Sequence, residues 1–179
     1  ITKKTKAIIA VHYAGVSCDM DPILKIAKRY KLYVIEDAAQ AILSSYKGRP
    51  LGSIGDLGTL SFHESKNIHC GEGGALLINN NKLIKKAKII RDKGTNREAF
   101  NNNFVKKYTW VSIGSSYGLS EINAAFLYAQ LSKAKSIIEK RIEIWNNYHL
   151  LFYELENEKK LARPNIPIYA KNNAHIYYL

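Results

Sequence analysis

The chain of 179 residues has little cysteine, no long apolar run and far fewer acidic than basic residues. Its two cysteines, Cys18 and Cys70, form no CxxC pair, which argues against a secreted disulfide scaffold and against a zinc ribbon. The longest apolar runs, such as Ala7–Val11 and Ala124–Ala129, fall far short of the ~20 residues that a membrane span needs. Because no charged segment followed by an apolar one opens the chain, we expect a cytoplasmic protein without a membrane span.

The composition favours a folded domain. Hydrophobic residues make up 46% of the chain, which excludes a disordered protein. A chain of 179 residues can build one substantial core but not two large domains. Lysine and arginine number 27 against 15 acidic residues, so the net charge is +12.

The segment 82–93 concentrates basic residues, and two interpretations are open. A nucleic-acid or anionic-membrane surface would use such charge. However, Leu83, Ile84, Ala87 and Ile90 lie at helical spacing between the basic residues, which is typical of an amphipathic helix with a solvated face. No aromatic residues alternate with the basic ones, so we favour the helix and expect no nucleic-acid partner.

The hydrophobic pattern predicts an α/β fold. Ala7–Val11 and residues 32–35 are apolar runs typical of strands buried on both faces of a parallel sheet. Between them, residues 21–30 carry an apolar stripe at helical spacing, with Asp21 as the expected cap. This order predicts a βαβ unit with a right-handed crossover.

The rest of the chain continues this organisation. A loop is expected over 44–58, strands over 60–62 and 75–78, and a lysine-rich helix over 80–93 that stops at Gly94. From Ser120 a long helical pattern begins. We therefore expect three regions: a cofactor-binding large-domain segment over 1–118, a long connecting helix over 119–160, and the start of a small C-terminal domain over 161–179.

Polar residues follow two of the expected strands. Glu36 and Asp37 end one strand, where α/β sheets deliver functional side chains, and by strand alternation only one of them can face the crevice. Capping of a helix is the alternative role for the acid. Lys66 follows a later strand and could form an imine, although in isolation it could equally be a surface lysine.

The combination of these groups points to one cofactor. An acid ends one strand, Ser61 and Lys66 lie at the end of another, and Gly71–Gly74 lets the backbone approach closely. An imine-forming lysine, an acid for a pyridine nitrogen and a hydroxyl for a phosphate are what a pyridoxal phosphate site requires.

Several segments together resemble the DegT/StrS-type nucleotide-sugar aminotransferases over nearly the whole chain. The segments that carry this family resemblance are Val11–Gly15, Glu36–Gln40, Ser61–Asn67 and Gly71–Ala75. Three further segments resemble the branch that makes dTDP-4-amino-4,6-dideoxygalactose from the 4-keto sugar: Gly94–Arg97, Tyr108–Trp110 and Ile113–Tyr117.

The resemblance implies a fold-type-I aminotransferase large domain and a role for five residues. Lys66 would hold pyridoxal 5'-phosphate as an imine, and Asp37 would pair with its pyridine nitrogen. Gln40 would lie near the phenolic oxygen and Ser61 would bind the phosphate. In most of the family an Asn reaches the phosphate from the neighbouring subunit, and here Ser116 takes that position.

The resemblance also implies a function. We expect transamination of a nucleotide-linked 4-keto-6-deoxy sugar, with glutamate as amino donor, by a homodimer that serves lipopolysaccharide biosynthesis. No metal is expected, and His12 and His63 are expected to order loops beside the cofactor rather than to react.

The chain is shorter than members of this family and is expected to be a central fragment. It begins at Ile1 rather than Met and ends on an aromatic run, 174–179, that resembles a strand cut short. Two alternatives therefore stay open: a truncated, non-catalytic relative, and a basic binding protein on the same fold. On its own this fragment is expected to be inactive.

Overall fold

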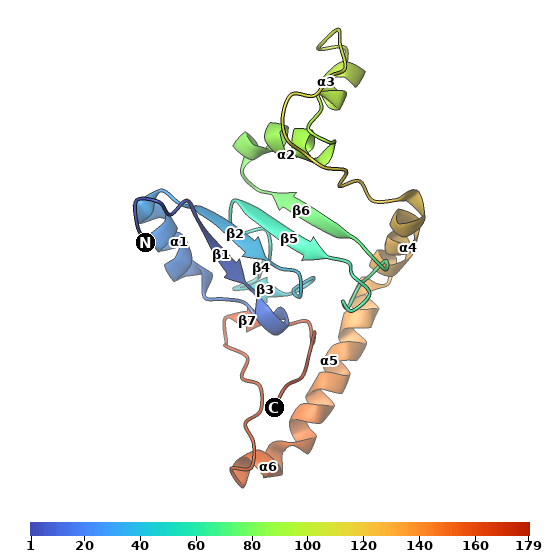
Figure 1. Cartoon of the computed structure of the whole chain (residues 1–179). Helices are drawn as coiled ribbons and strands as arrows, with labels where there is room; N and C mark the ends of the chain where they lie inside the picture. The colour runs from blue at the N-terminus through green and yellow to red at the C-terminus, as the bar shows by residue number, and fades with distance from the viewer. The chain divides into compact units, whose positions relative to one another are not determined.

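The structure is a computed structural model that describes all residues from Ile1 to Leu179. It divides into two compact units, each of which we describe by itself (Figure 1). Unit 1 comprises residues 1–79 and 123–179, and unit 2 comprises residues 80–122. None of the helices combines the length and the apolar character that crossing a membrane would require.

Unit 1 is built on a four-stranded, mostly parallel sheet, so the predicted α/β class is confirmed. The strand order is β1-β2-β5-β6, with β1 over Ala7–Val11, β2 over Tyr33–Asp37, β5 over Leu57–Ser61 and β6 over Gly74–Ile78. The first three strands are parallel, and β6 runs antiparallel to β5. The helix α1 (Met20–Tyr30) joins β1 to β2 and completes the predicted βαβ unit.

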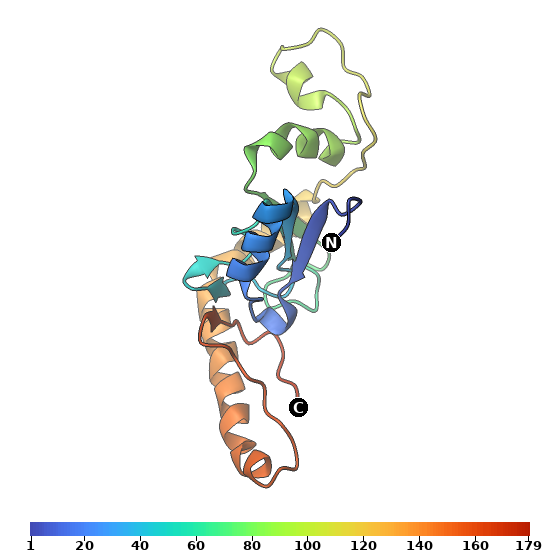
Figure 2. The same cartoon turned by 90° about the vertical axis from the view of Figure 1, so that its left-hand side faces the viewer.

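The helix α1 covers one face of the sheet, as the side view of unit 1 shows (Figure 2). Asp19 occupies the N-cap position, so the expectation that Asp21 caps this helix was wrong. Asp21 lies in the first turn instead, where its carboxylate pairs with Lys47 Nζ at 2.7 Å. An acid in the first turn is still favourable, because it faces the positive end of the helix dipole.

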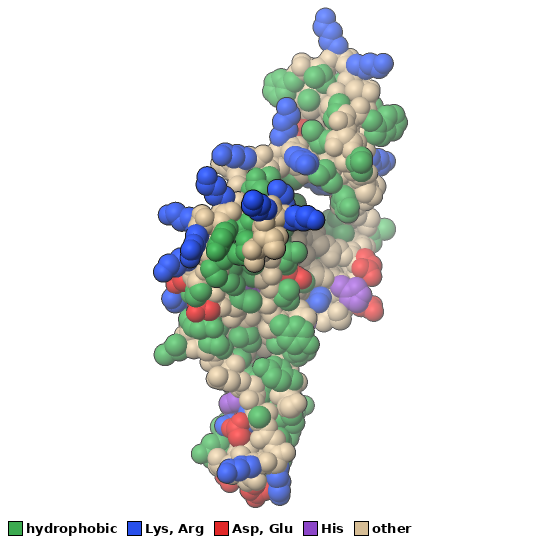
Figure 3. Space-filling model, turned by 60° about the vertical axis from the view of Figure 1, so that its left-hand side comes forward, with side chains coloured by type: hydrophobic (Ala, Val, Ile, Leu, Met, Phe, Trp, Pro, Cys, Tyr) green, Lys and Arg blue, Asp and Glu red, His purple; other side chains and the backbone are tan.

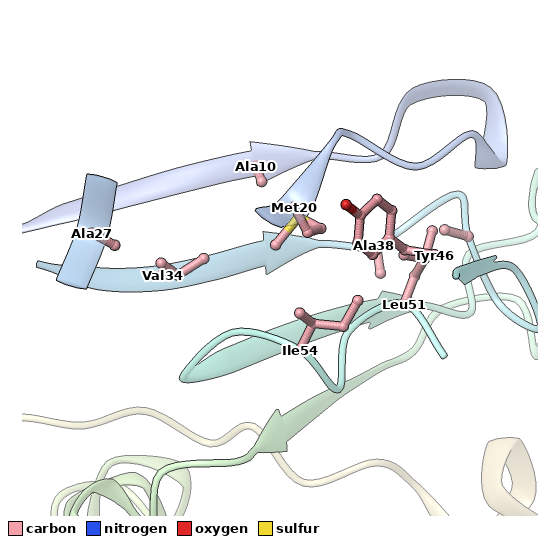
Figure 4. Close-up of a cluster of buried hydrophobic side chains, with 9 residues drawn as sticks. Ala10, Met20, Ala27, Val34, Ala38, Tyr46, Leu51 and Ile54 are labelled. Carbon is pink, nitrogen blue, oxygen red and sulfur yellow. The ribbon is translucent and has the colours of Figure 1, made fainter. Parts of the chain in front are cut away.

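Small and flexible apolar side chains form the main core (Figure 4). Alanines on α1 and β1 let the helix approach the sheet closely, and Met20 is completely buried. Tyr46 is also fully buried and places its hydroxyl on Asp19 Oδ1 at 2.7 Å. The members of this cluster are Ala10, Met20, Ala27, Val34, Ala38, Ala41, Tyr46, Leu51 and Ile54.

The segment predicted as a loop over 44–58 contains two short strands. These are β3 (Ser45–Tyr46) and β4 (Arg49–Pro50), which form a small antiparallel sheet with β7 (Ala170–Lys171) in the order β4-β3-β7. The segment before the C-terminus is thereby attached to the first half of unit 1.

The predicted long helix is divided into three. These helices are α4 (Glu121–Ser132), α5 (Ala134–Leu151) and α6 (Tyr153–Asn157). Lys133 and Phe152, at the breaks, have ψ angles near zero, and such angles interrupt the α-helical hydrogen-bond ladder. No strand forms over 174–179, contrary to expectation. The three domain boundaries proposed from the sequence stay a prediction.

Unit 2 contains the lysine-rich segment. A short 3₁₀ turn, η2 (Asn81–Leu83), leads into α2 (Ile84–Arg91), and α3 (Arg97–Asn101) follows. Gly94 adopts a φ of +75° just after α2, and a Cβ there would lie 2.0 Å from the carbonyl oxygen of Ser112, so only glycine fits.

Lys and Arg side chains lie at several places on the molecular face drawn in Figure 3, with few acidic side chains among them. In unit 2, Lys88 nevertheless pairs with Glu98, and Arg91 contacts Asp92. The charge of α2 is therefore partly matched by neighbouring acids, which agrees with a solvated helix face.

Candidate active site

Strand β2 ends in two acids that face opposite ways. Glu36 is fully buried on the α1 side of the sheet, and its carboxylate accepts four hydrogen bonds. The donors are His12 Nε2 at 3.0 Å and the backbone N–H groups of Gly52, Ile54 and Gly55 at 2.8, 2.6 and 2.7 Å. Although burial acts against ionisation, these donors hold the pKa of Glu36 below its ordinary value. All four hydrogen bonds of the Glu36 carboxylate therefore come from the protein itself, so Glu36 has a structural role.

His12 is the buried partner of Glu36. Burial opposes a positive charge on the ring, whereas the carboxylate of Glu36 beside Nε2 favours one. The backbone N–H of Cys18 can only donate, however, and it points at His12 Nδ1 at 3.2 Å, which requires a lone pair there. We therefore assign the neutral ring, with the proton on Nε2 donated to Glu36. His12 thus orders the loop after β1 through the Cys18 amide, and its position beside a cofactor stays a prediction.

Asp37 lies on the other, open face of the sheet. It pairs in register with Val11 of β1, which is 50% exposed, and with Thr59 of β5. Its Oδ1 accepts the backbone N–H of Ala39 at 3.1 Å and lies 3.5 Å from the Thr59 hydroxyl. Its Oδ2 has no protein partner, so one carboxylate oxygen is available to a ligand.

Ser61 and Lys66 follow the neighbouring strand β5. Ser61 ends that strand, and its Oγ accepts the backbone N–H of His63 at 3.3 Å, which leaves the hydroxyl proton free. The backbone N–H of Lys66 bonds the His63 carbonyl at 2.9 Å, while His63 Nδ1 lies 2.9 Å from Ser65 Oγ. Lys66 is half-buried, and its amine has no ion pair or hydrogen bond.

Gln40 is held by the loop after β1. Its Oε1 accepts the backbone N–H of Ala14 at 2.6 Å, which fixes the amide so that Nε2 is left as a free donor. Ala14 itself adopts a left-handed φ of 58°. Non-glycine residues in that region cluster at functional sites.

Four side chains with spare hydrogen-bonding capacity thus follow two adjacent strands: Asp37, Gln40, Ser61 and Lys66. Because β2 and β5 are parallel, their carboxyl ends meet at one edge of the sheet, where α/β proteins bind ligands. Ser116 belongs to unit 2, where it forms an isolated bridge with Asp92. Its predicted role at the phosphate stays a prediction.

Sequence reasoning missed three residues of this region: Asn67, Asn173 and His175. Asn67 is hydrogen-bonded to both of the others, although more than 100 positions separate it from them. No local periodicity reports such a contact. The available signal was the place of Asn67 at the end of the resembling segment Ser61–Asn67, directly after Lys66.

Comparison with known proteins places this site in context. The family model of the DegT/DnrJ/EryC1/StrS aminotransferases matches residues 1–178. GDP-perosamine synthase of Caulobacter vibrioides is 35% identical over 179 residues, which cover 100% of this chain and 45% of that protein. The UDP-4-amino-4,6-dideoxy-N-acetyl-beta-L-altrosamine transaminase of Campylobacter jejuni is 38% identical over 177 residues, which cover 96% of this chain and 43% of that protein.

Solved structures agree with this match. The PLP form of Spr1654 from Streptococcus pneumoniae superposes with a TM-score of 0.84 at 25% identity, covering 99% of this chain and 48% of that one. The predicted aminotransferase large-domain fold is thereby confirmed, and the chain spans about half the length of these relatives. Because the family model matches nearly its whole length, the chain belongs to the DegT/DnrJ/EryC1/StrS aminotransferase family.

Proposed function

We propose that the protein carrying this chain catalyses pyridoxal phosphate-dependent transamination of a nucleotide-linked 4-keto-6-deoxy sugar, with glutamate as amino donor. The observation that supports this most is the chemistry of the four unsatisfied side chains at the β2 and β5 ends. They comprise one acid, one primary amine, one hydroxyl and one amide donor: Asp37, Lys66, Ser61 and Gln40.

This donor set fits the cofactor group by group. Asp37 Oδ2 would accept the proton of the pyridine nitrogen and keep the ring cationic. Gln40 Nε2 would donate to the phenolic oxygen, and the Ser61 hydroxyl would donate to the phosphate. Ser116 would reach the phosphate of a second subunit. Lys66 would bind the aldehyde carbon through its amine, which no protein acid neutralises.

When bound, pyridoxal phosphate supplies an electron sink for the carbon next to the amine of the bound substrate. Lys66, once released, would act as the base that takes the proton from that carbon and returns it to the cofactor side. Asp37 would stabilise the negative charge that this transfer develops, because it holds the ring nitrogen protonated. In the second half-reaction the same groups would deliver the amine to the keto sugar.

The choice of substrate class is supported by the relatives and by the segments noted above. The two curated relatives act, by name, on GDP-linked and UDP-linked sugars. The segments Gly94–Arg97 and Ile113–Tyr117 resemble the branch that aminates a dTDP-linked 4-keto-6-deoxy sugar. We therefore propose the dTDP-linked sugar, with a homodimer as the active form.

A nitrogen-transfer assay tests this function. The purified protein is incubated with ¹⁵N-glutamate and, separately, dTDP-, GDP- and UDP-linked 4-keto-6-deoxy sugars, and the products are analysed by mass spectrometry. We expect ¹⁵N in the dTDP sugar, loss of transfer in Lys66→Ala, and retention in the control Lys85→Ala on the exposed face of α2. Absence of ¹⁵N in all three sugars, from protein that holds cofactor, would favour a non-catalytic relative.

A further inference from the structure

The segment 173–175 is locked onto the loops that carry the candidate site. Asn173 is fully buried, and its Nδ2 donates to the carbonyl oxygens of Gln40 and Ile42, both at 2.9 Å. It packs so closely on Gly15 that a Cβ at that position would lie 2.0 Å from Asn173 Oδ1. The backbone around His175 is therefore held in place independently of His175 itself.

Asn67 joins this segment to the lysine loop, and its amide orientation is fixed by its partners. Its Nδ2 donates to the backbone carbonyl of Asn173 at 2.8 Å. A carbonyl oxygen only accepts, so the amide nitrogen must face it and Oδ1 must face the other way. Asn67 Oδ1 lies 3.0 Å from Nδ1 of His175. Because Oδ1 can only accept, Nδ1 of His175 carries a proton.

The charges around His175 keep its ring neutral. Arg141 donates to the backbone carbonyls of Ala174 and His175, at 3.2 and 2.8 Å, and the positive charge of Lys66 also acts on the ring. Burial, together with the charges of Lys66 and Arg141, lowers the pKa of His175 to about 4. With Nδ1 protonated and the ring neutral, Nε2 carries a lone pair, and it has no protein partner.

We propose that Asn67 is a positioning residue that fixes His175 as the neutral ring with its proton on Nδ1, so that Nε2 serves as a hydrogen-bond acceptor for a hydroxyl or amine group of the substrate. The proposal rests on the proposed function only in taking Lys66 as the reacting centre. An unprotonated ring nitrogen can only accept hydrogen bonds, so His175 would discriminate between substrates by their hydrogen-bond donors.

His12 offers a built-in comparison. There the Cys18 amide occupies Nδ1, and the proton resides on Nε2, which is the opposite tautomer to that assigned to His175. The two rings should therefore give opposite nitrogen patterns in one spectrum. The His12 pattern also reports whether a variant is folded, because it depends on the loops around Glu36.

The test is nitrogen NMR of the chain labelled with ¹⁵N-histidine, recorded near pH 7. We expect one ring with protonated Nδ1 and unprotonated Nε2, assigned to His175 by its loss in His175→Gln, and His12 with the reverse pattern. Unprotonated Nδ1 at His175 in the unmodified chain would overturn the proposal. This readout needs neither cofactor nor activity, so it stands apart from a failure of the proposed transamination.

Variants of Asn67 distinguish two roles for this residue: positioning the His175 ring, and merely holding the segment 173–175 in place. In Asn67→Ala we expect His175 to show averaged signals of exchanging tautomers, while His12 is unchanged. In Asn67→Asp the acceptor remains and adds negative charge, so Nδ1 should stay protonated and the titration of His175 should move to higher pH. The matched control Asn79→Ala loses two amide-to-carbonyl bonds elsewhere in unit 1 and should leave His175 unaffected.

Activity measurements on the cofactor-loaded protein test the effect of Asn67 on function. We expect Asn67→Ala to retain cofactor and to lose about tenfold in kcat/KM, which corresponds to the loss of roughly one hydrogen bond. The pH profile should gain a group near the ordinary histidine range in Asn67→Asp but not in Asn79→Ala. An Asn67→Ala protein with an unchanged His175 tautomer would contradict the positioning role, whatever its activity.

Discussion

Among single residues, the adjacent acids Glu36 and Asp37 have different roles, because strand alternation points them to opposite faces of the sheet. Glu36 points into the core and accepts four hydrogen bonds, whereas Asp37 points to the open face with one oxygen unused. The same residue chemistry thus serves stability in one case and, in our proposal, catalysis in the other. Substitutions at the two positions should separate these effects.

Glu36→Gln should lower the free energy of unfolding by about 3 kcal/mol, because a neutral amide cannot accept four donors and its NH₂ would face backbone N–H groups. Urea unfolding followed by circular dichroism measures this change. Glu36→Asp should also destabilise the fold, since the aspartate side chain is one methylene shorter and cannot reach all four donors. A loss below about 0.5 kcal/mol in Glu36→Gln would show that the buried carboxylate is not needed.

The contribution of the Glu36 carboxylate should also make the free energy of unfolding depend on pH. The pKa of Glu36 in the folded protein lies below its ordinary value of 4.5, so the unfolded chain binds its proton more tightly. Its stabilisation is therefore fully present above about pH 4.5 and is lost as pH falls through the folded-state pKa. In urea titrations at several pH values, Glu36→Gln should lose this acid-sensitive part of the stability.

Asp37→Asn should leave stability within about 0.5 kcal/mol, because only Oδ1 has protein partners. It should retain cofactor but lose most transamination, since an amide cannot keep the ring nitrogen protonated. Cofactor content by absorbance and activity with glutamate measure the two effects. Full activity in Asp37→Asn would contradict the pairing with the ring.

At the scale of elements, the loop between β4 and β5 supports the site through close backbone contact. A Cβ on Gly58 would lie 2.1 Å from the carbonyl oxygen of Gly52, and Gly52 cannot move away without disturbing the hydrogen bond that its N–H donates to Glu36. Gly58→Ala should therefore cost about 3 kcal/mol of unfolding free energy. The control Gly118→Ala meets open space and should change it by less than about 0.5 kcal/mol. Equal effects of both would refute this explanation.

The sequence predicted those features that depend on neighbouring residues, and it missed those that depend on contacts between distant segments. Apolar runs predicted β1 and β2 because buried parallel strands have a distinctive composition, and Asp37 ends the second of these runs. The break in the long helix at Lys133 was missed because no proline or glycine marks it. Asn173 and His175 were missed because their contacts arise only when distant segments fold together.

At the scale of the whole molecule, our proposal places two chains around each site. Ser116 belongs to unit 2 and would complete the phosphate site of a partner subunit, as a two-fold assembly allows. Mixing inactive Lys66→Ala protein with inactive Ser116→Trp protein should restore part of the activity, because one site of the mixed dimer is intact. No recovery, with mixed dimers demonstrated by native mass spectrometry, would count against a shared site.

Trapping the cofactor on its lysine identifies the residue that forms the imine. The yellow, cofactor-loaded protein is reduced with borohydride, digested, and its modified peptide is identified by mass spectrometry. We predict bleaching of the absorbance and a single pyridoxyl adduct on Lys66, with no adduct in Lys66→Ala. An adduct on any other lysine would contradict the assignment of Lys66 as the imine-forming residue.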